Sequence, residues 1–390
     1  MPVLPQHIQS IPPSGIRRFF DIAATMDDVI SLGIGEPDFV TPRPVIDAAV
    51  QSLAAGKTGY TSNAGLLELR ESIADHLFQL YGYEVNADQV LITVGASEAM
   101  ELTMLALLNP GDEVLIPEPC FVSYGPVAQF AHGKIVYVPT SVENNFEVTA
   151  EDIATRVTSK TRMIFMGYPS NPTGAVLSHQ TLEDIAQIAE EHDLILVSDE
   201  IYDQLIYGAV KDKGHPSAWS VDSLRERSII LGGFSKAYAM TGWGLGYAIA
   251  PAPIYEGLYK VHQYMVMSAP TMAQYGAIAA MKNCGIDVEN MRQAYDRRRR
   301  LLVDSLRSAG LPTFEPEGAF YCFPDIRSTG LSSDEFAERL IKEKSVAVVP
   351  GDAFGPSGTG FVRCSYATSD EKVAEAGRRI GQFVQNIKDT

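Results

Sequence analysis

The sequence of 390 residues lacks the signals of membrane and secreted proteins. Its densest apolar stretch, residues 102–108, is far shorter than the roughly 20 residues that a membrane-spanning helix needs. The first residues, Met-Pro-Val-Leu-Pro-Gln-His, contain no basic start that leads into an apolar run. We therefore expect neither a transmembrane helix nor a secretory signal peptide.

Cysteine is scarce, and two nucleotide-binding motifs are absent. The cysteines lie more than four residues apart, which excludes a paired-cysteine metal site or redox pair; they are Cys120, Cys284, Cys322 and Cys364. We interpret them as small buried hydrophobic residues in a protein of a reducing compartment, and predict a cytoplasmic location. The sequence contains neither a GxGxxG dinucleotide fingerprint nor a P-loop.

Positive charge is also in short supply. Lysine and arginine number 31 against 48 aspartates and glutamates, which gives a formal net charge of −17. Such a surface repels nucleic-acid backbones and anionic membranes, so neither is expected as a partner. Hydrophobic residues make up 46% and charged residues 20%, ordinary values for a globular protein with a large core. The length favours two or three domains.

Short apolar segments alternate with helix-length segments over the first 270 residues. The apolar segments are rich in Val, Ile and Leu without clean alternation, which is typical of strands buried on both faces of a mostly parallel sheet. This order predicts a large three-layer α/β domain with seven strands. The predicted strands span residues 90–94, 113–116, 134–138, 162–168, 194–198, 228–231 and 245–250, and predicted amphipathic helices span 66–80, 98–108 and 181–192.

After about residue 271 the pattern changes to long helices and shorter strands. We interpret the basic run at residues 297–300 as a solvated helix face. The pattern predicts a smaller α+β domain, so we expect a large domain over residues 42–280 and a small one formed by 1–41 and 281–390. The helices predicted after residue 270 span residues 271–281, 288–309, 333–344 and 370–388, and the strands span 320–323, 346–349 and 361–366.

The most informative segment spans residues 232–246 and follows a predicted buried strand. It holds one lysine, Lys236, among small and apolar residues. Desolvation there disfavours the ammonium form and lowers the pKa of the lysine. A neutral amine is what bonding to an aldehyde requires. A lone lysine is usually a surface charge, but the strand end, the adjacent Ser235 and the lack of neighbouring charges favour a chemical role.

Three more polar segments follow predicted strands. Asp199 ends an apolar run, where it could hold a positive partner of a bound ligand or cap a helix. Residues 168–174, which include Asn171, favour a rigid turn. Residues 93–98 lead from a strand into a helix, so they could form either an anion site or an ordinary helix start.

Together these segments resemble the fold type I pyridoxal-phosphate-dependent aminotransferases of class I and II. The resemblance extends over nearly the whole chain. Further segments that match the family are residues 31–39 (SLGIGEPDF), Tyr60 with the following Gly65, Leu69 and Arg70, residues 318–321 (GAFY), and residues 361–366 (FVRCSY).

The resemblance implies pyridoxal 5′-phosphate as the cofactor, no metal, and a role for each matching residue. Lys236 would bond to the cofactor and move a proton, Asp199 would pair with the pyridine nitrogen, and Tyr202 would reach the phenolic oxygen. These three are the expected catalytic residues. The other expected cofactor ligands are Asn171 at the phenolic oxygen, Phe121 stacked on the ring, and Gly95, Ala96, Ser97 and Ser235 at the phosphate.

The resemblance also implies substrate contacts and a partner subunit. Arg363 would grip the substrate α-carboxylate with a bidentate fork that lysine could not copy, beside Gly35 and Asn171. Tyr60 would reach the phosphate of the neighbouring subunit, which implies a homodimer. One position departs from the family: eight residues after the lysine, where the family has an arginine that pairs with the phosphate, this chain has Gly244.

The implied function is an aminotransferase that works by a ping-pong cycle with a 2-oxo acid such as 2-oxoglutarate. Residues 14–21, with the later motifs, favour an aromatic or broad-specificity amino donor; aspartate and alanine come next. Two alternatives stay open. One is a pyridoxal-phosphate-dependent carbon–sulfur or other β/γ-lyase on the same scaffold. The other, suggested by Gly244, is a non-catalytic protein that binds pyridoxal phosphate.

Overall fold

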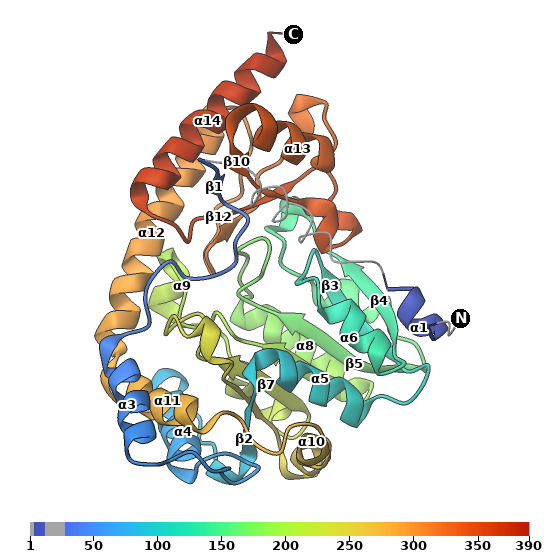
Figure 1. Ribbon diagram of the computed structural model, residues 1–390. Helices are drawn as coiled ribbons and strands as arrows, with labels where there is room; N and C mark the ends of the chain where they lie inside the picture. The colour runs from blue at the N-terminus through green and yellow to red at the C-terminus, as the bar shows by residue number, and fades with distance from the viewer. Residues whose placement is uncertain (1–3, 12–27, 390) are drawn as a thin grey trace.

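The computed structural model describes residues 4–11 and 28–389. Residues 14–21, which suggested the substrate class, lie outside this part of the chain. Figure 1 shows a large sheet domain below and a smaller domain above, with the C-terminus at the far end of the smaller one. None of the helices in the described residues is both long and apolar enough to cross a membrane.

The large domain is built on a seven-stranded sheet, as the apolar segments predicted. Every strand pair is parallel except those made by β8, which runs antiparallel to both neighbours. Strands β2, β3 and β8 are buried along their whole length, and β6 and β7 are buried except at their last residue, which explains their unbroken apolar composition. In spatial order the strands are β2 (Val90–Thr93), β8 (Gly246–Ile249), β7 (Ser228–Gly233), β6 (Ile195–Asp199), β5 (Thr161–Gly167), β3 (Glu113–Glu118) and β4 (Lys134–Pro139).

Helices cover this sheet and complete the predicted three layers (Figure 1). α5 packs on β8 and on α10, and α11 packs on α3 and α4. The helices of this part are α3 (Arg43–Ala54), α4 (Leu67–Tyr81), α5 (Gly95–Leu107), α6 (Tyr124–Phe130), α7 (Ala150–Ala154), α8 (His179–Glu191), α9 (Gly208–Lys213), α10 (Ala252–Met265) and α11 (Thr271–Asn283), and a short α1 (Gln6–Gln9) precedes them.

The smaller domain contains a two-stranded and a three-stranded sheet packed against long helices. Strand β1 pairs in parallel with β10, which brings the segment after residue 28 onto the C-terminal part of the chain. The predicted boundaries at residues 41 and 281 stay predictions, which this pairing supports. The elements are β1 (Ile30–Ser31), β9 (Tyr321–Cys322), β10 (Val346–Ala347), β11 (Val349–Pro350), β12 (Val362–Ser365), α12 (Gly285–Ser308), α13 (Ser333–Lys344) and α14 (Asp370–Lys388).

The basic run on α12 is only partly the solvated face that we expected. Arg297 is exposed, but Arg298 and Arg299 are 7% and 6% exposed. Arg298 bridges Asp38 and Asp370 at 2.9 and 2.8 Å, because two acidic residues from distant segments meet it. A buried guanidinium needs such partners, and these ones connect three segments of the small domain.

The four cysteines are buried and form no disulfide, as predicted.

Candidate active site

A cavity of about 720 Å³ opens at the carboxyl ends of the parallel strands, between the two domains. It has the size of a small-molecule site. Among the residues that line it are eleven predicted site residues: Gly35, Gly95, Ala96, Ser97, Phe121, Asn171, Asp199, Tyr202, Ser235, Lys236 and Arg363. Tyr60 is not among the lining residues and is 81% exposed.

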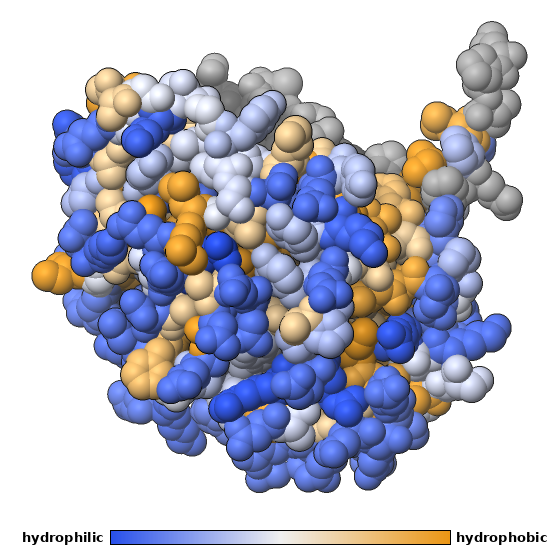
Figure 2. All heavy atoms as spheres, turned by 90° about the horizontal axis from the view of Figure 1, so that it is seen from below, coloured by the Kyte–Doolittle hydropathy of each residue, from blue (hydrophilic) through white to orange (hydrophobic). Residues whose placement is uncertain are grey.

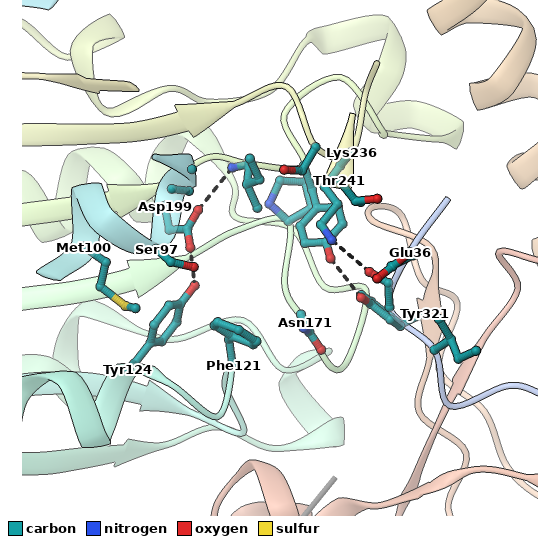
Figure 3. A pocket seen from close by; sticks show the side chains of 18 of the residues that line it. Glu36, Ser97, Met100, Phe121, Tyr124, Asn171, Asp199, Lys236, Thr241 and Tyr321 are labelled. Atoms are coloured by element: carbon teal, nitrogen blue, oxygen red, sulfur yellow. Dashed lines mark hydrogen bonds between the residues drawn. The ribbon is translucent and has the colours of Figure 1, made fainter. Parts of the chain in front are cut away.

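Lys236 follows β7 and points into this cavity (Figure 3). Its Nζ donates a hydrogen bond of 2.8 Å to the Gly35 carbonyl, and lies 5.9 Å from the ring centroid of Tyr202. Burial lowers the pKa of Lys236 to about 8, although the charges of Glu36 and Asp199 oppose the shift. The sequence predicted this direction and this cause. Near neutral pH a minor fraction of Lys236 is therefore already in the form of the neutral amine, which can bond to an aldehyde.

Asp199 ends β6 and faces the cavity opposite Lys236 (Figure 3). One carboxylate oxygen accepts a hydrogen bond of 2.7 Å from the Tyr124 hydroxyl, and the other accepts one of 3.2 Å from the Ile201 amide. Burial raises the pKa of Asp199 to about 6, and the two hydrogen bonds work against that rise. A carboxylate that is buried in this way is stabilised when a positively charged group of a ligand binds beside it.

The beginning of α5 forms an anion cradle on the same wall. Gly95, Ala96 and Ser97 occupy its first turn, whose backbone N–H groups have no intrahelical partner, and the N-cap residue Val94 provides no side-chain cap within the described part of the chain. Strand β8 runs so close that a Cβ on Gly246 would lie 2.5 Å from the Ala96 nitrogen. Glycine at 246 is therefore what allows the cradle and the lysine loop to share one wall.

Arg363 comes from β12 of the small domain and is buried at the other end of the cavity. Its Nη1 donates to the Asn171 side-chain oxygen at 2.8 Å, and its Nη2 donates to the Gly33 carbonyl at 2.6 Å. Its Nε is buried without a hydrogen-bond partner among the described residues. Buried polar atoms are normally paired, so this geometry suits a bound acceptor such as a carboxylate.

Sequence reasoning missed several residues of the site. Tyr124, which bonds Asp199, stands three residues after the predicted Phe121, and its position after β3 was the available signal. The Tyr321 hydroxyl lies 2.8 Å from that of Tyr202, inside a segment noticed only as a motif. Thr241 also lines the cavity. Within the described residues no cluster of His, Cys, Asp and Glu could hold a metal ion.

The lowered pKa of Lys236 gives a testable pH dependence. In the cofactor-free protein, the rate of acylation of Lys236 should rise about tenfold per pH unit below its pKa of about 8 and level off above it, since the amine is mostly neutral there. Competitive labelling followed by peptide mass spectrometry measures this, with exposed Lys57 as the internal control. Reactivity of Lys236 that still rises steeply at pH 10 would show that its amine is not desolvated.

Comparison with known proteins identifies the family of this chain. The family model described as "Aminotransferase class I and II" matches residues 27–380. An "Aspartate aminotransferase" of Pyrococcus abyssi is 47% identical over 97% of this chain and 98% of its own length. An "Aromatic-amino-acid aminotransferase 2" of Thermococcus litoralis is 44% identical over 99% of both chains. The crystal structure of an aromatic aminotransferase from Pyrococcus horikoshii matches with a TM-score of 0.90 and 45% identity, over 96% of this chain and 100% of that one. The chain therefore belongs to the class I and II aminotransferase family and is a pyridoxal-phosphate-dependent enzyme of it.

Proposed function

We propose that the enzyme transfers an amino group to a 2-oxo acid such as 2-oxoglutarate, and that the amino donor is an aromatic amino acid or one of a broad range of amino acids. The observation that carries the proposal is one cavity that combines a desolvated lysine, a buried aspartate opposite it, a cradle of free amides and a buried arginine with an unpartnered Nε. Pyridoxal phosphate, when bound, supplies an aldehyde that bonds to amines and a ring that withdraws electrons from the substrate Cα.

The residues of the chain would bind the cofactor and the substrate and would move the proton. The α5 amides with Ser97 and Ser235 would hold the phosphate, and Asp199 would keep the ring nitrogen protonated. Burial raises the pKa of Tyr202, so its hydroxyl keeps its proton and donates a hydrogen bond. Lys236, as a neutral amine, would take the proton from Cα and deliver it to the cofactor carbon that is bonded to the amino nitrogen. Arg363 binds the α-carboxylate and so orients the Cα–H bond.

The side chains of the cavity wall support the proposal of an aromatic amino donor or of a broad range of donors. Among the described lining residues the cations are Lys236 and Arg363, both of which have other tasks, and Glu36 adds a negative charge. A second carboxylate, whether on the donor or on an acceptor such as 2-oxoglutarate, would therefore find no free cation among these residues, and 2-oxoglutarate would bind through its α-carboxylate and oxo group. Apolar side chains such as Ile34 and Phe121 line the same space. Relatives named for aspartate and for aromatic amino acids are both similar to this chain, so the support for an aromatic or broad donor comes from the composition of the wall.

A half-reaction tests the proposal. Phenylalanine alone should convert the bound cofactor stoichiometrically to pyridoxamine phosphate, which is followed by absorbance, and a 2-oxo acid should convert it back. Aspartate serves as the comparison donor, and pyruvate against 2-oxoglutarate measures what a second carboxylate contributes to the acceptor. Continuous turnover of an amino acid without any acceptor would instead favour a lyase. No spectral change with any amino acid would favour a non-catalytic binding protein.

A homodimer is the second part of the proposal. Tyr60 is 81% exposed and Tyr264 is 89% exposed, which is unusual for side chains of this size. Hydrogen bonds from Asn63 to the Met267 carbonyl and from Thr271 to the Gly59 carbonyl hold their segments side by side. Figure 2 shows hydrophobic groups that stand among hydrophilic ones on the lower face. Such a surface fits a second copy of the chain, with Tyr60 extended into the partner's site.

The cytoplasmic location stays a prediction from the sequence.

Arg363→Lys should impair substrate binding more than chemistry. The two buried hydrogen bonds to Asn171 and Gly33 fix the plane of the guanidinium, and lysine offers no planar fork. We expect kcat/KM to fall about 10²-fold, mostly through KM, since a buried charge pair contributes several kcal/mol. Steady-state kinetics with one donor checks this. An unchanged KM with a reduced kcat would show that Arg363 does not grip the carboxylate.

Gly244→Arg should tighten the binding of pyridoxal phosphate by about 1.5–3 kcal/mol, the contribution of a charge-assisted hydrogen bond. Gly244 lines the cavity, and among the described residues the one atom within 4 Å of a Cβ built there is Val94 Cγ1, at 3.7 Å. Its φ of +58° strains any other residue, so the variant should also lose about 1–2 kcal/mol of stability.

Gly244→Ala is the matched control, because it introduces the same strain without the charge. Titration of both apoproteins with pyridoxal phosphate measures the affinity, and thermal unfolding measures the strain. Equal or weaker binding by Gly244→Arg than by Gly244→Ala would mean that another group already neutralises the phosphate.

A further inference from the structure

A buried pair of ionisable residues lies directly behind the anion cradle. Glu98 follows Ser97 on the first turn of α5 and is 7% exposed, and His262 on α10 is fully buried. Nδ1 of His262 lies 2.8 Å from Oε1 of Glu98, and Nε2 lies 2.9 Å from the Asn63 carbonyl oxygen. The other Glu98 oxygen accepts a hydrogen bond from the backbone N–H of Val94, a residue of the cavity wall.

These contacts fix the number of protons in the pair. The Asn63 carbonyl can only accept a hydrogen bond, so Nε2 of His262 bears a proton. A second proton must lie between Nδ1 and Oε1, because two lone pairs at 2.8 Å would repel each other. Whether the nitrogen or the oxygen holds that proton, Glu98 and His262 together have no net charge.

The absence of net charge matters for what binds in front of the pair. The proposed phosphate ligands at Gly95–Ser97 and Ser235 are neutral donors, and a phosphate monoester has a charge of about −1.5 to −2 near neutral pH. An uncompensated carboxylate at position 98, one hydrogen bond behind Val94, would repel that group. With His262 as its partner, Glu98 can hold the Val94 amide without adding a negative charge to the cradle.

We propose that Glu98 and His262 are positioning residues for the cofactor phosphate, which hold the turn at Val94–Ser97 and cancel each other's charge behind it. The proposal rests on the binding of pyridoxal phosphate in this cavity. The same contacts join three segments that are distant in the sequence: the start of α5, α10, and the loop that holds Asn63. Since Asn63 also bonds the Met267 carbonyl, the loop that contains Tyr60 is held in register with the cradle.

His262→Gln tests the role of the charge. It removes the partner that cancels the charge of the Glu98 carboxylate, so the affinity of the apoprotein for pyridoxal phosphate should fall about tenfold or more. The affinity for pyridoxal, which lacks the phosphate, should stay within about twofold. Absorbance titrations of the apoprotein with the two compounds give both constants. If the two residues contribute only to folding, His262→Gln would weaken the binding of both compounds equally. The ratio of the two affinities is therefore the informative quantity.

Three further variants complete the test. Glu98→Gln should keep the wild-type ratio, because a glutamine and a neutral histidine can form the same hydrogen bonds without net charge. The double variant Glu98→Gln/His262→Gln should restore the ratio that His262→Gln loses. His76→Gln, which removes a histidine of α4 outside the cavity, is the matched control and should behave as wild type.

The outcomes separate this proposal from the proposed function. A wild-type ratio for His262→Gln would overturn it, as would an equal loss in Glu98→Gln. If His262→Gln does not fold, a lowered ratio in Glu98→Gln or in the double variant overturns the proposal, and a retained ratio in both supports it. A wild-type apoprotein that binds neither compound would contradict the proposed function itself.

Discussion

Lys236→Ala should abolish amino transfer and leave the protein folded. Lys236 is the proposed group that bonds to the cofactor aldehyde and moves the Cα proton, and a positioned acid–base group alone contributes about 10²–10⁴-fold to a rate. We expect turnover to fall by about 10⁴-fold or more, because both roles are lost. The fold should persist, since among the described residues the side chain donates a hydrogen bond to the Gly35 carbonyl alone, and a desolvated amine contributes little stability.

Lys236→Arg is the matched control for this experiment. Arginine keeps a cation in the cavity but remains protonated at any accessible pH, so it can neither bond to an aldehyde nor accept the proton. Both variants should be inactive in steady-state assays and should show the circular dichroism of the wild type. Turnover within about tenfold of wild type in either variant would be incompatible with a Lys236 that does the chemistry.

Asp199→Ala should have the second largest effect, with a rate loss of about 10²–10³-fold. Asp199 lies opposite Lys236, and the Tyr124 hydroxyl and the Ile201 amide fix its two oxygens. Without the carboxylate the ring nitrogen loses its proton, and the ring withdraws fewer electrons from Cα. Asp199→Glu should lose much less activity than Asp199→Ala, because it keeps the charge.

Asp199→Asn separates charge from shape, since the amide fills the same space and keeps a hydrogen-bond acceptor. We expect Asp199→Asn to be nearly as slow as Asp199→Ala, with Asp199→Glu clearly faster than both. Single-turnover absorbance with one amino acid measures the step directly. If all three variants keep near-native rates, Asp199 only caps the turn at Ile201.

The large sheet was predictable from the sequence because burial on both faces leaves continuous apolar segments. All seven predicted strands are present, and the helices α13 and α14 have the predicted bounds. The helices α3 and α10 were not predicted. Each has a proline in its first turn, at Pro44 and Pro253, and proline suggests a break although it fits that position.

The candidate site was predictable to the extent that it lies at strand ends. Asp199 and Lys236 follow neighbouring parallel strands, whose carboxyl ends meet at one edge. Arg363 belongs to another domain, and only the family resemblance placed it in the site. Contacts between distant segments could not be predicted at all: Tyr124 against Asp199, Arg298 between two aspartates, and His262 against Glu98 depend on the folded arrangement.

If Lys236 is the covalent anchor of the cofactor, chemical reduction of the loaded enzyme will fix the cofactor to this residue. The enzyme loaded with pyridoxal phosphate is reduced with borohydride, which makes the bond between cofactor and lysine permanent, and the digested protein is mapped by mass spectrometry. We expect a single modified lysine, on the peptide that contains Lys236. A modification on another lysine, such as the exposed Lys57, with Lys236 unmodified, would contradict it.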